Sequence, residues 1–295
     1  MKDYLRKHTW MPGSAVVILV AMPLLILAKD IRSWSRFIEQ LEEFDQEKKL
    51  QDASPEQTIH PQAINVPIFI YHSVNPRYPG ETALQDAYDI TPELFEAHLQ
   101  YLESHHYTAV SLDDLADYFD TGKSLPPNPV ILNFDDGWEN QFIYAFPLLR
   151  KYHDSATFFI YMHVVGYKHF LSWKEIEEMV QGGMRIGAHT KTHPLLAHIT
   201  NSDQLRDEIA GSKKILEDRL QQPVTVFAYP YGQYNDGVVR AVQEAGFRMA
   251  RSTYRGVYHT RSDRYTLKAI LVSDSMEDFV RMLQAAQEGS TGAAQ

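Results

Sequence analysis

The chain has 295 residues, of which 44% are hydrophobic, enough to bury the core of one large domain or two small ones. Its formal net charge of −10 argues against a nucleic-acid partner, because phosphate binding requires clustered lysine and arginine. The absence of cysteine excludes disulfides, thiolate metal sites, a cysteine nucleophile and a lipidated N-terminal cysteine.

A separate segment opens the chain. Residues 10–28 are uncharged and mostly aliphatic, and as a helix they would span about 28 Å, close to the roughly 30 Å of a bilayer core. A cleaved signal peptide and a retained signal-anchor are both compatible with this pattern. Ile26, three residues before a cleavage point after Ala28, is not small, which favours the anchor.

The positive residues on the two sides of this segment nearly balance, so the charge rule alone gives little orientation. We expect residues 1–9 in the cytoplasm and the rest of the membrane-anchored chain outside it, in the periplasm or at the cell surface. Residues 29–64 are expected to form a helical stem and a polar linker. The stem is compatible with a coiled coil, a helix on the membrane or a helix packed on its own domain.

From residue 65 on, strand-like and helix-like segments alternate. Such alternation predicts βα units around a parallel sheet or barrel, with the chemistry at the carboxyl ends of the strands. Residues 286–295 are expected to be a disordered tail. The expected strands are residues 66–71, 107–111, 130–134, 156–161, 185–188, 224–228, 248–252 and 267–272, and the expected helices are residues 92–104, 173–180, 202–220 and 236–245.

Two carboxylates, Asp135 and Asp136, follow one expected strand, and two imidazoles, His189 and His193, follow another. Either pair by itself is also compatible with an ordinary turn or with surface histidines. When both pairs end strands of one sheet, neutral imidazoles and one carboxylate make a three-ligand site with open positions for water, as catalytic zinc requires. The second aspartate can then remove a proton from that water.

Two further strand ends carry polar groups. Tyr229-Pro230-Tyr231-Gly232 ends a third strand, and its proline and glycine shape a tight loop that can aim a backbone N–H at a developing oxyanion. An ordinary strand-to-helix turn is the alternative interpretation. His72 follows the first strand, where a lone histidine is more often structural.

The order and spacing of these motifs, with Gly137 closing the first and Pro194 the second, resemble the polysaccharide deacetylase family, also called NodB-homology domains or carbohydrate esterase family 4. The resemblance covers residues 65–285. It implies an α/β fold, a distorted (β/α)7 barrel, and a single divalent metal ion, with zinc as the first choice and cobalt or nickel as alternatives. It also implies removal of acetyl groups from N-acetylated or O-acetylated sugars.

The resemblance assigns roles by position. Asp135 resembles the catalytic base of the family, and Asp136, His189 and His193 resemble its metal ligands. Tyr231 resembles the residue whose backbone N–H binds the oxyanion.

The chain departs from the family pattern in two places. Ala228 stands where the family has an arginine that orients the base, and the last expected strand carries no histidine to act as general acid. His72 resembles the histidine that serves as acid in a branch with circularly permuted motifs, which includes poly-N-acetylglucosamine deacetylases of biofilm systems. We therefore expect His72 to be the acid, with His259 as second choice.

The expected function is de-N-acetylation of an envelope or extracellular polymer that contains N-acetylhexosamine. Two alternatives remain: a deacetylase or esterase of a small or lipid-linked glycan, and a catalytically inactive glycan-binding scaffold, which the two departures favour. Trp138 and Trp173 are candidates for stacking on sugar rings or for core and lid positions.

Overall fold

The computed structural model describes residues 63–77 and 88–291. The expected anchor at residues 10–28 lies outside the described residues, as does the stem and linker up to residue 62. Within the two described ranges, no helix is both long enough and apolar enough to cross a membrane.

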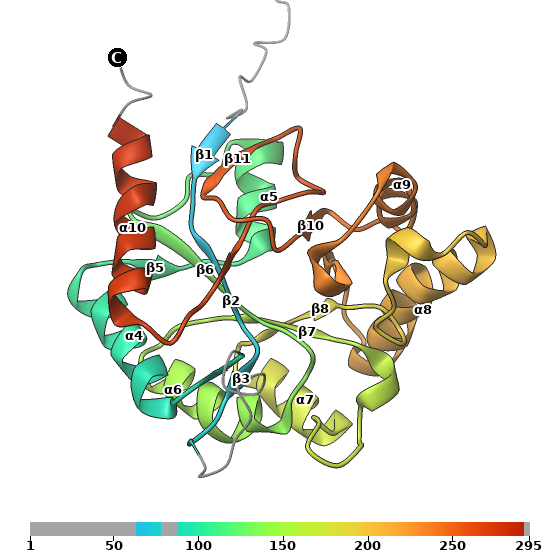
Figure 1. Ribbon diagram of the computed structural model, residues 1–295, viewed down its shortest axis with the longest axis horizontal. Coiled ribbons are helices and arrows are strands. Elements are labelled where there is room, and N and C mark those ends of the chain that lie inside the picture. The colour runs from blue at the N-terminus through green and yellow to red at the C-terminus, as the bar shows by residue number, and fades with distance from the viewer. Residues whose placement is uncertain (1–62, 78–87, 292–295) are drawn as a thin grey trace, which may run out of the picture. The chain divides into compact units, whose positions relative to one another are not determined.

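A curled parallel sheet forms the centre of the fold (Figure 1). Its strands are hydrogen-bonded in the order β10, β9, β8, β7, β6, β2 and β12, and β5 pairs with β6 beside this path. Every expected strand is present in this sheet. The bounds are β2 Ile68–Tyr71, β5 Thr108–Ala109, β6 Pro129–Phe134, β7 Thr157–Ile160, β8 Arg185–Ala188, β9 Val226–Ala228, β10 Met249–Arg251 and β12 Ile270–Leu271.

The two edges of the sheet approach each other. Arg251 on β10 and Leu267, just before β12, form an isolated parallel bridge. The Ser252 N–H donates to the Leu267 carbonyl at 2.8 Å, and the Leu267 N–H donates to the Ala250 carbonyl at 3.0 Å. The expected α/β class with a parallel sheet is confirmed, and its edges meet through this bridge instead of a continuous ladder.

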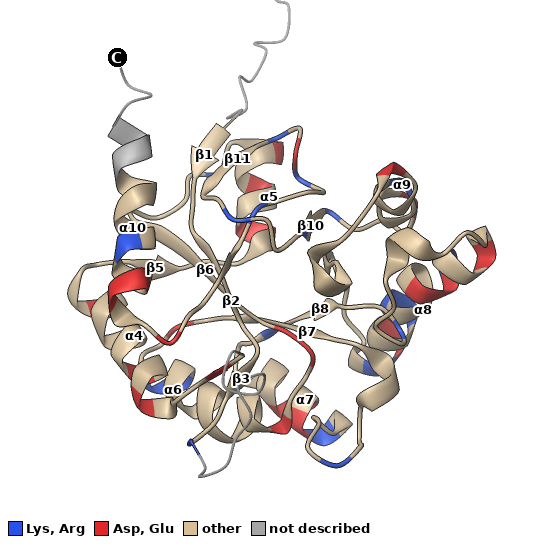
Figure 2. Cartoon of the chain, in the orientation of Figure 1, with Lys and Arg blue, Asp and Glu red and all other residues tan. Residues whose placement is uncertain are grey.

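Helices surround the strands, and they carry most of the charged residues, while the central strands carry few (Figures 1 and 2). The helices are α4 Pro92–Ser104, α5 Leu112–Thr121, α6 Phe146–Lys151, α7 Trp173–Gln181, α8 Ser202–Leu220, α9 Asp236–Glu244 and α10 Met276–Thr291. Short helices are η1 Gln141–Ala145, η2 Met162–Val164, η3 Leu196–His198 and η4 Pro230–Gly232, and two small sheets pair β1 Ala63–Asn65 with β11 Tyr258–Thr260 and β3 Ser73–Val74 with β4 Asp89–Ile90.

Helix α10 corrects the expected disordered tail, because residues 286–291 are helical. Phe279, Leu283 and Ala286 are buried at helical spacing, so this helix is held by packing of one apolar face. Residues 292–295 lie outside the described part of the chain.

Strand alternation divides the core into two clusters. Leu132 and Phe134 on β6 pack in the cluster that the surrounding helices cover, whereas Ile131 packs in a second cluster with β2 residues and with Leu115 and Phe119 of α5. Asn133, between Leu132 and Phe134, is fully buried as well. Residues that alternate with Leu132 and Phe134 therefore point into the curl of the sheet.

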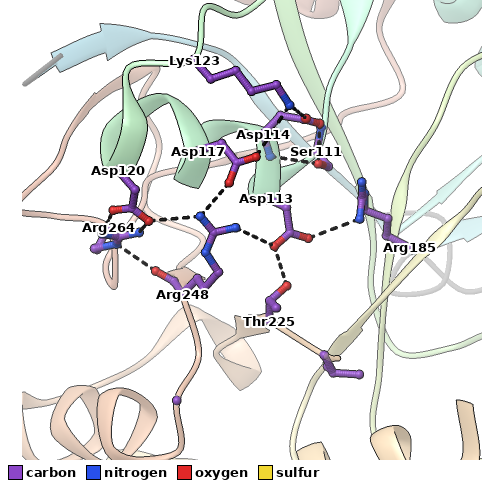
Figure 3. Close-up of polar contacts among 12 residues, drawn as sticks. Ser111, Asp113, Asp114, Asp117, Asp120, Lys123, Arg185, Thr225, Arg248 and Arg264 are labelled. Atoms are coloured by element: carbon purple, nitrogen blue, oxygen red, sulfur yellow. Dashed lines mark hydrogen bonds and ion pairs between the residues drawn. The ribbon is translucent and has the colours of Figure 1, made fainter. Parts of the chain in front are cut away.

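Helix α5 is tied to the amino ends of the strands by ion pairs (Figure 3). Arg248, just before β10, donates to Asp117 at 2.8 Å and to Asp120 at 3.1 Å. Arg264 makes two bonds to Asp120, at 2.7 and 3.0 Å. Hydrogen bonds from Arg264, and then from Arg248, lower the pKa of Asp120 to about 2. Helix α5 therefore closes one end of the sheet, and the other end is left for the site.

Candidate active site

The carboxyl ends of the strands open into a cavity of about 1030 Å³. Strand register brings its groups together: Tyr71 on β2 pairs with Phe134 on β6, so the residues that follow them leave the sheet at the same level. The residues expected from the sequence as base, first-choice acid, metal ligands and oxyanion donor all line this cavity: His72, Asp135, Asp136, His189, His193 and Tyr231.

The two adjacent aspartates both reach the cavity because the chain turns between them. Asp135 is 3% exposed and continues the inward-facing positions of β6. Asp136 has a left-handed backbone with φ 74°, and Gly137 follows with φ 75°. A Cβ at Gly137 would lie 2.9 Å from Ile160, so this turn requires glycine. The backbone reversal brings the second carboxylate to the same side as the first.

Asp136, His189 and His193 form a candidate metal centre. The Nε2 atoms of the two histidines are 3.2 Å apart, and Asp136 Oδ1 lies 3.7 Å from that of His189 and 3.5 Å from that of His193. Ligands of a tetrahedral zinc ion at bond lengths of about 2.05 Å are about 3.3 Å from one another. The three side chains therefore fit one divalent ion without rearrangement.

The protonation of the two histidines suits this role. His189 Nδ1 lies 2.7 Å from the Ala228 carbonyl, which only accepts, so Nδ1 carries the proton and Nε2 keeps its lone pair. Burial lowers the pKa of His189 to about 4, and it lowers the pKa of His193 as well. Both imidazoles are therefore neutral at pH 7, as metal ligation requires.

Asp136 has its own outer partner. The Trp138 indole N–H donates to Asp136 Oδ2 at 3.4 Å, on the oxygen that does not face the histidines. Trp138 lines the cavity and its ring stacks on Phe170 at 4.5 Å between centroids. Trp173, in contrast, is the first residue of α7 and packs under the Arg219 guanidinium. Of the two tryptophans considered from the sequence, only Trp138 borders the cavity.

Arg251 is a site residue that the sequence reasoning missed. It ends β10, its side chain is 0% exposed, and its Nη2 donates to Asp135 Oδ1. Burial raises the pKa of Asp135, but the charge and hydrogen bond of Arg251, together with the nearby imidazoles of His189 and His72, hold this pKa below its usual value. In the sheet, Arg251 pairs with Ala228, the position where the family pattern has arginine. In the sequence, the available signal for this role was an arginine at the end of an otherwise apolar strand.

The two histidines considered as general acid lie at opposite ends of β2. His72 follows its carboxyl end, lines the cavity and has its ring 5.0 Å from that of Tyr88. His259 lies on β11, fully buried, with Nε2 2.9 Å from the carbonyl of Val66, just before the amino end of β2. Of these two candidates, His72 is the one that lines the cavity with Asp135.

Gln141 joins the backbones that carry these two groups. This fully buried side chain donates from Nε2 to the His72 carbonyl and to the Asp135 carbonyl, both at 2.6 Å. Gln141 begins η1, a π-helix, and such irregular turns are frequent at functional sites. One amide therefore fixes the end of β2 relative to the end of β6.

The loop after β9 supplies a backbone donor. Tyr231 lines the cavity and has φ 58° within η4, and Gly232 follows with φ 68°. The N–H of Tyr231 belongs to the first turn of this short helix, so it has no intrahelical acceptor. Left-handed backbone at Asp136, His193 and Tyr231 places strain where the cavity groups converge.

A curled parallel sheet with two histidines, one carboxylate and a second, buried carboxylate at its carboxyl end makes a candidate metal centre of the kind that metal-dependent hydrolases use. The profile of the polysaccharide deacetylase family matches residues 122–250. The Bacillus subtilis protein YxkH, named as a polysaccharide deacetylase, is 30% identical over 211 residues, which cover 72% of each chain. The chain therefore belongs to the polysaccharide deacetylase family of hydrolases.

Further similarities agree with this family. A Staphylococcus epidermidis poly-β-1,6-N-acetyl-D-glucosamine N-deacetylase is 28% identical over 209 residues, covering 66% of this chain and 72% of the relative. The Streptococcus pyogenes deacetylase PplD, solved with acetate, superposes with a TM-score of 0.70 at 27% identity, over 75% of this chain and 98% of PplD. IcaB from Ammonifex degensii gives a TM-score of 0.67 at 25% identity, over 77% and 99%.

Proposed function

We propose that this protein is a metal-dependent de-N-acetylase of an envelope or extracellular polymer that contains N-acetylhexosamine. The observation that carries the proposal is the convergence of the Asp136, His189 and His193 ligand atoms within 4.8 Å, beside the buried Asp135–Arg251 pair, in one cavity. Relatives named as poly-β-1,6-N-acetyl-D-glucosamine N-deacetylases support the choice of polymer.

Asp136, His189 and His193 would hold one divalent ion, with zinc preferred and cobalt or nickel as alternatives. When bound, such an ion supplies Lewis-acid polarisation of the acetamide carbonyl and lowers the pKa of water. The low pKa of Asp135 keeps it ionised, so it can take a proton from the attacking water. Arg251 fixes the orientation of that carboxylate by donating to one of its oxygens.

The remaining groups serve the tetrahedral stage and its breakdown. The free N–H of Tyr231 is available to the oxyanion that develops on the acetamide oxygen. His72 donates a proton to the departing sugar amine, which otherwise is a poor leaving group. Trp138 and Tyr88 give the cavity wall apolar faces against which a sugar ring can pack.

The proposal is tested by acetate release. The full chain loaded with zinc, cobalt or nickel should release acetate from β-1,6-linked N-acetylglucosamine oligomers, with peptidoglycan and acetylated xylan as comparison substrates. Asp135→Asn should abolish release while metal still binds, and Asp203→Asn, on the exposed face of α8, should leave release unchanged. No release from any of these glycans would contradict the proposed function.

We also propose that residues 10–28 anchor the protein in a membrane, with the deacetylase domain outside the cytoplasm. The support is the length and apolar character of that segment. The protein should stay with the membrane fraction through alkaline carbonate extraction, and protease added to intact cells or spheroplasts should digest the domain. Release into the soluble fraction would contradict anchoring.

A further inference from the structure

The loop that carries the two histidines is supported by a buried carboxylate from helix α8, which lies outside β8 (Figure 1). Glu208 is 6% exposed and lies on the inward face of α8 with Ile209 and Ser212. Glutamate is rarely buried to this degree unless its oxygens are engaged in hydrogen bonds. The partners of this carboxylate therefore indicate what it does.

Glu208 accepts three hydrogen bonds from two consecutive residues of the loop. Its Oε2 accepts the backbone N–H groups of Lys191 and Thr192, both at 2.9 Å, and its Oε1 accepts the Thr192 hydroxyl at 2.6 Å. A carboxylate only accepts hydrogen bonds, so it matches three converging donors better than any neutral side chain. These donors lie between His189 and His193.

This loop has a conformation that does not persist without support. Thr190 has φ 72° and His193 has φ 60°, both in the left-handed region that β-branched and bulky residues avoid. Within the loop, the His193 N–H donates to the Thr190 hydroxyl at 2.9 Å. Strained backbone of this kind persists only where the surroundings over-determine it. The loop therefore depends on contacts from neighbouring elements.

Those contacts come from two sides. On one side, the N–H groups of Met162 and His163, after β7, donate to the carbonyls of Thr190 at 3.2 Å and Lys191 at 2.8 Å. On the other side, Glu208 accepts the N–H groups described above. The peptide groups between the two histidines are thus fixed at both their carbonyl and amide ends.

We propose that Glu208 is a positioning residue for the metal centre. It holds the turn at residues 190–192 so that His189 and His193 present their Nε2 atoms to one ion. The inference rests on the metal-dependent function proposed above. Loss of an outer partner of metal ligands typically weakens metal binding by about 10–100-fold.

The test is metal affinity of the full chain, measured by calorimetric titration with Zn²⁺ and by Co²⁺ absorption. Glu208→Ala should weaken binding by about 10–100-fold. Glu208→Gln should bind nearly as the unsubstituted protein does, because its amide oxygen can accept both N–H groups and its NH₂ can donate to the Thr192 hydroxyl oxygen. Asp207→Asn is the matched control, since it removes only the exposed pair with the Lys191 ammonium at 2.8 Å.

Circular dichroism checks that each variant is folded, and Glu208→Asp, which withdraws the carboxylate by one methylene, replaces Glu208→Ala if that variant does not fold. Unchanged metal affinity in the truncated variant, or an equal loss in Glu208→Gln, would overturn the proposal. Metal binding by the unsubstituted protein without acetate release would refute the proposed function and leave this inference standing. Acetate release with full metal affinity in Glu208→Ala would refute this inference alone.

Discussion

Replacing Arg251 with methionine is the most direct way to disrupt the buried ion pair between Arg251 and Asp135. The side chains of Arg251 and Asp135 are 0% and 4% exposed, so solvent does not screen their interaction. Removing one partner of such a pair leaves an uncompensated buried charge and typically costs about 3–5 kcal/mol. Since domains are stable by only about 5–15 kcal/mol, we expect a large loss in the free energy of unfolding.

Urea unfolding of the metal-free protein at pH 7, followed by circular dichroism, measures this loss. Arg248→Met, with a side chain 33% exposed and several acidic partners, should cost only about 1 kcal/mol. The double variant Arg251→Met/Asp135→Asn should recover about 2 kcal/mol relative to Arg251→Met, because a neutral amide replaces the unpaired charge. A loss for Arg251→Met below about 1 kcal/mol, or a double variant no more stable than it, would refute the reasoning.

Three further changes follow from the structure. Gln141→Met removes the donor shared by the His72 and Asp135 carbonyls, and kcat for acetate release should fall by about 10–100-fold with little change in KM. Burial raises the pKa of Asp154 from 3.8 to about 6. Between these two pH values the native state keeps a proton that the unfolded state releases, so the free energy of unfolding falls as pH rises from about 4 to about 6. Asp154→Asn should remove this slope and add about 1 kcal/mol at pH 7, discounted for partial exposure. Gly187→Ala would drive its Cβ into the Phe159 ring and should cost about 1–3 kcal/mol in urea unfolding.

Each of these three predictions would be contradicted by a specific outcome. A parallel rise in KM for Gln141→Met would indicate a substrate-binding role in place of a positioning one. If the free energy of unfolding of Asp154→Asn depended on pH as that of the unsubstituted protein does, the raised pKa of Asp154 would make no contribution to stability. A Gly187→Ala variant as stable as the unsubstituted protein would mean that the Phe159 ring moves freely, contrary to its packing in the second cluster, which also contains Ile131, Leu115 and Phe119.

Much of the scaffold could be read directly from the sequence because it depends on local rules. Thr91 accepts the Leu94 N–H as an N-cap, and Ser172 and Glu175 form a capping box, so these helices begin where their side chains predict. Helix α5 was missed although Ser111 caps it in the same way and Gly122 ends it. Helix α10 was missed although Ser275 accepts the Asp278 N–H and Phe279, Leu283 and Ala286 recur at helical spacing.

The candidate site, like the scaffold, has features that the sequence predicts and features that depend on the fold. The types and order of the chemical groups could be predicted from the sequence, since Asp135, Asp136, His189 and His193 stand beside recognisable strand ends. Their partners came from the tertiary fold: Arg251 and Asp135 are 116 residues apart in the chain and end strands β10 and β6, which are not neighbours in the sheet. They meet because the sheet curls and brings both strand ends to one cavity. A contact of this kind depends on the order and curl of the whole sheet, which packing settles and no local pattern encodes.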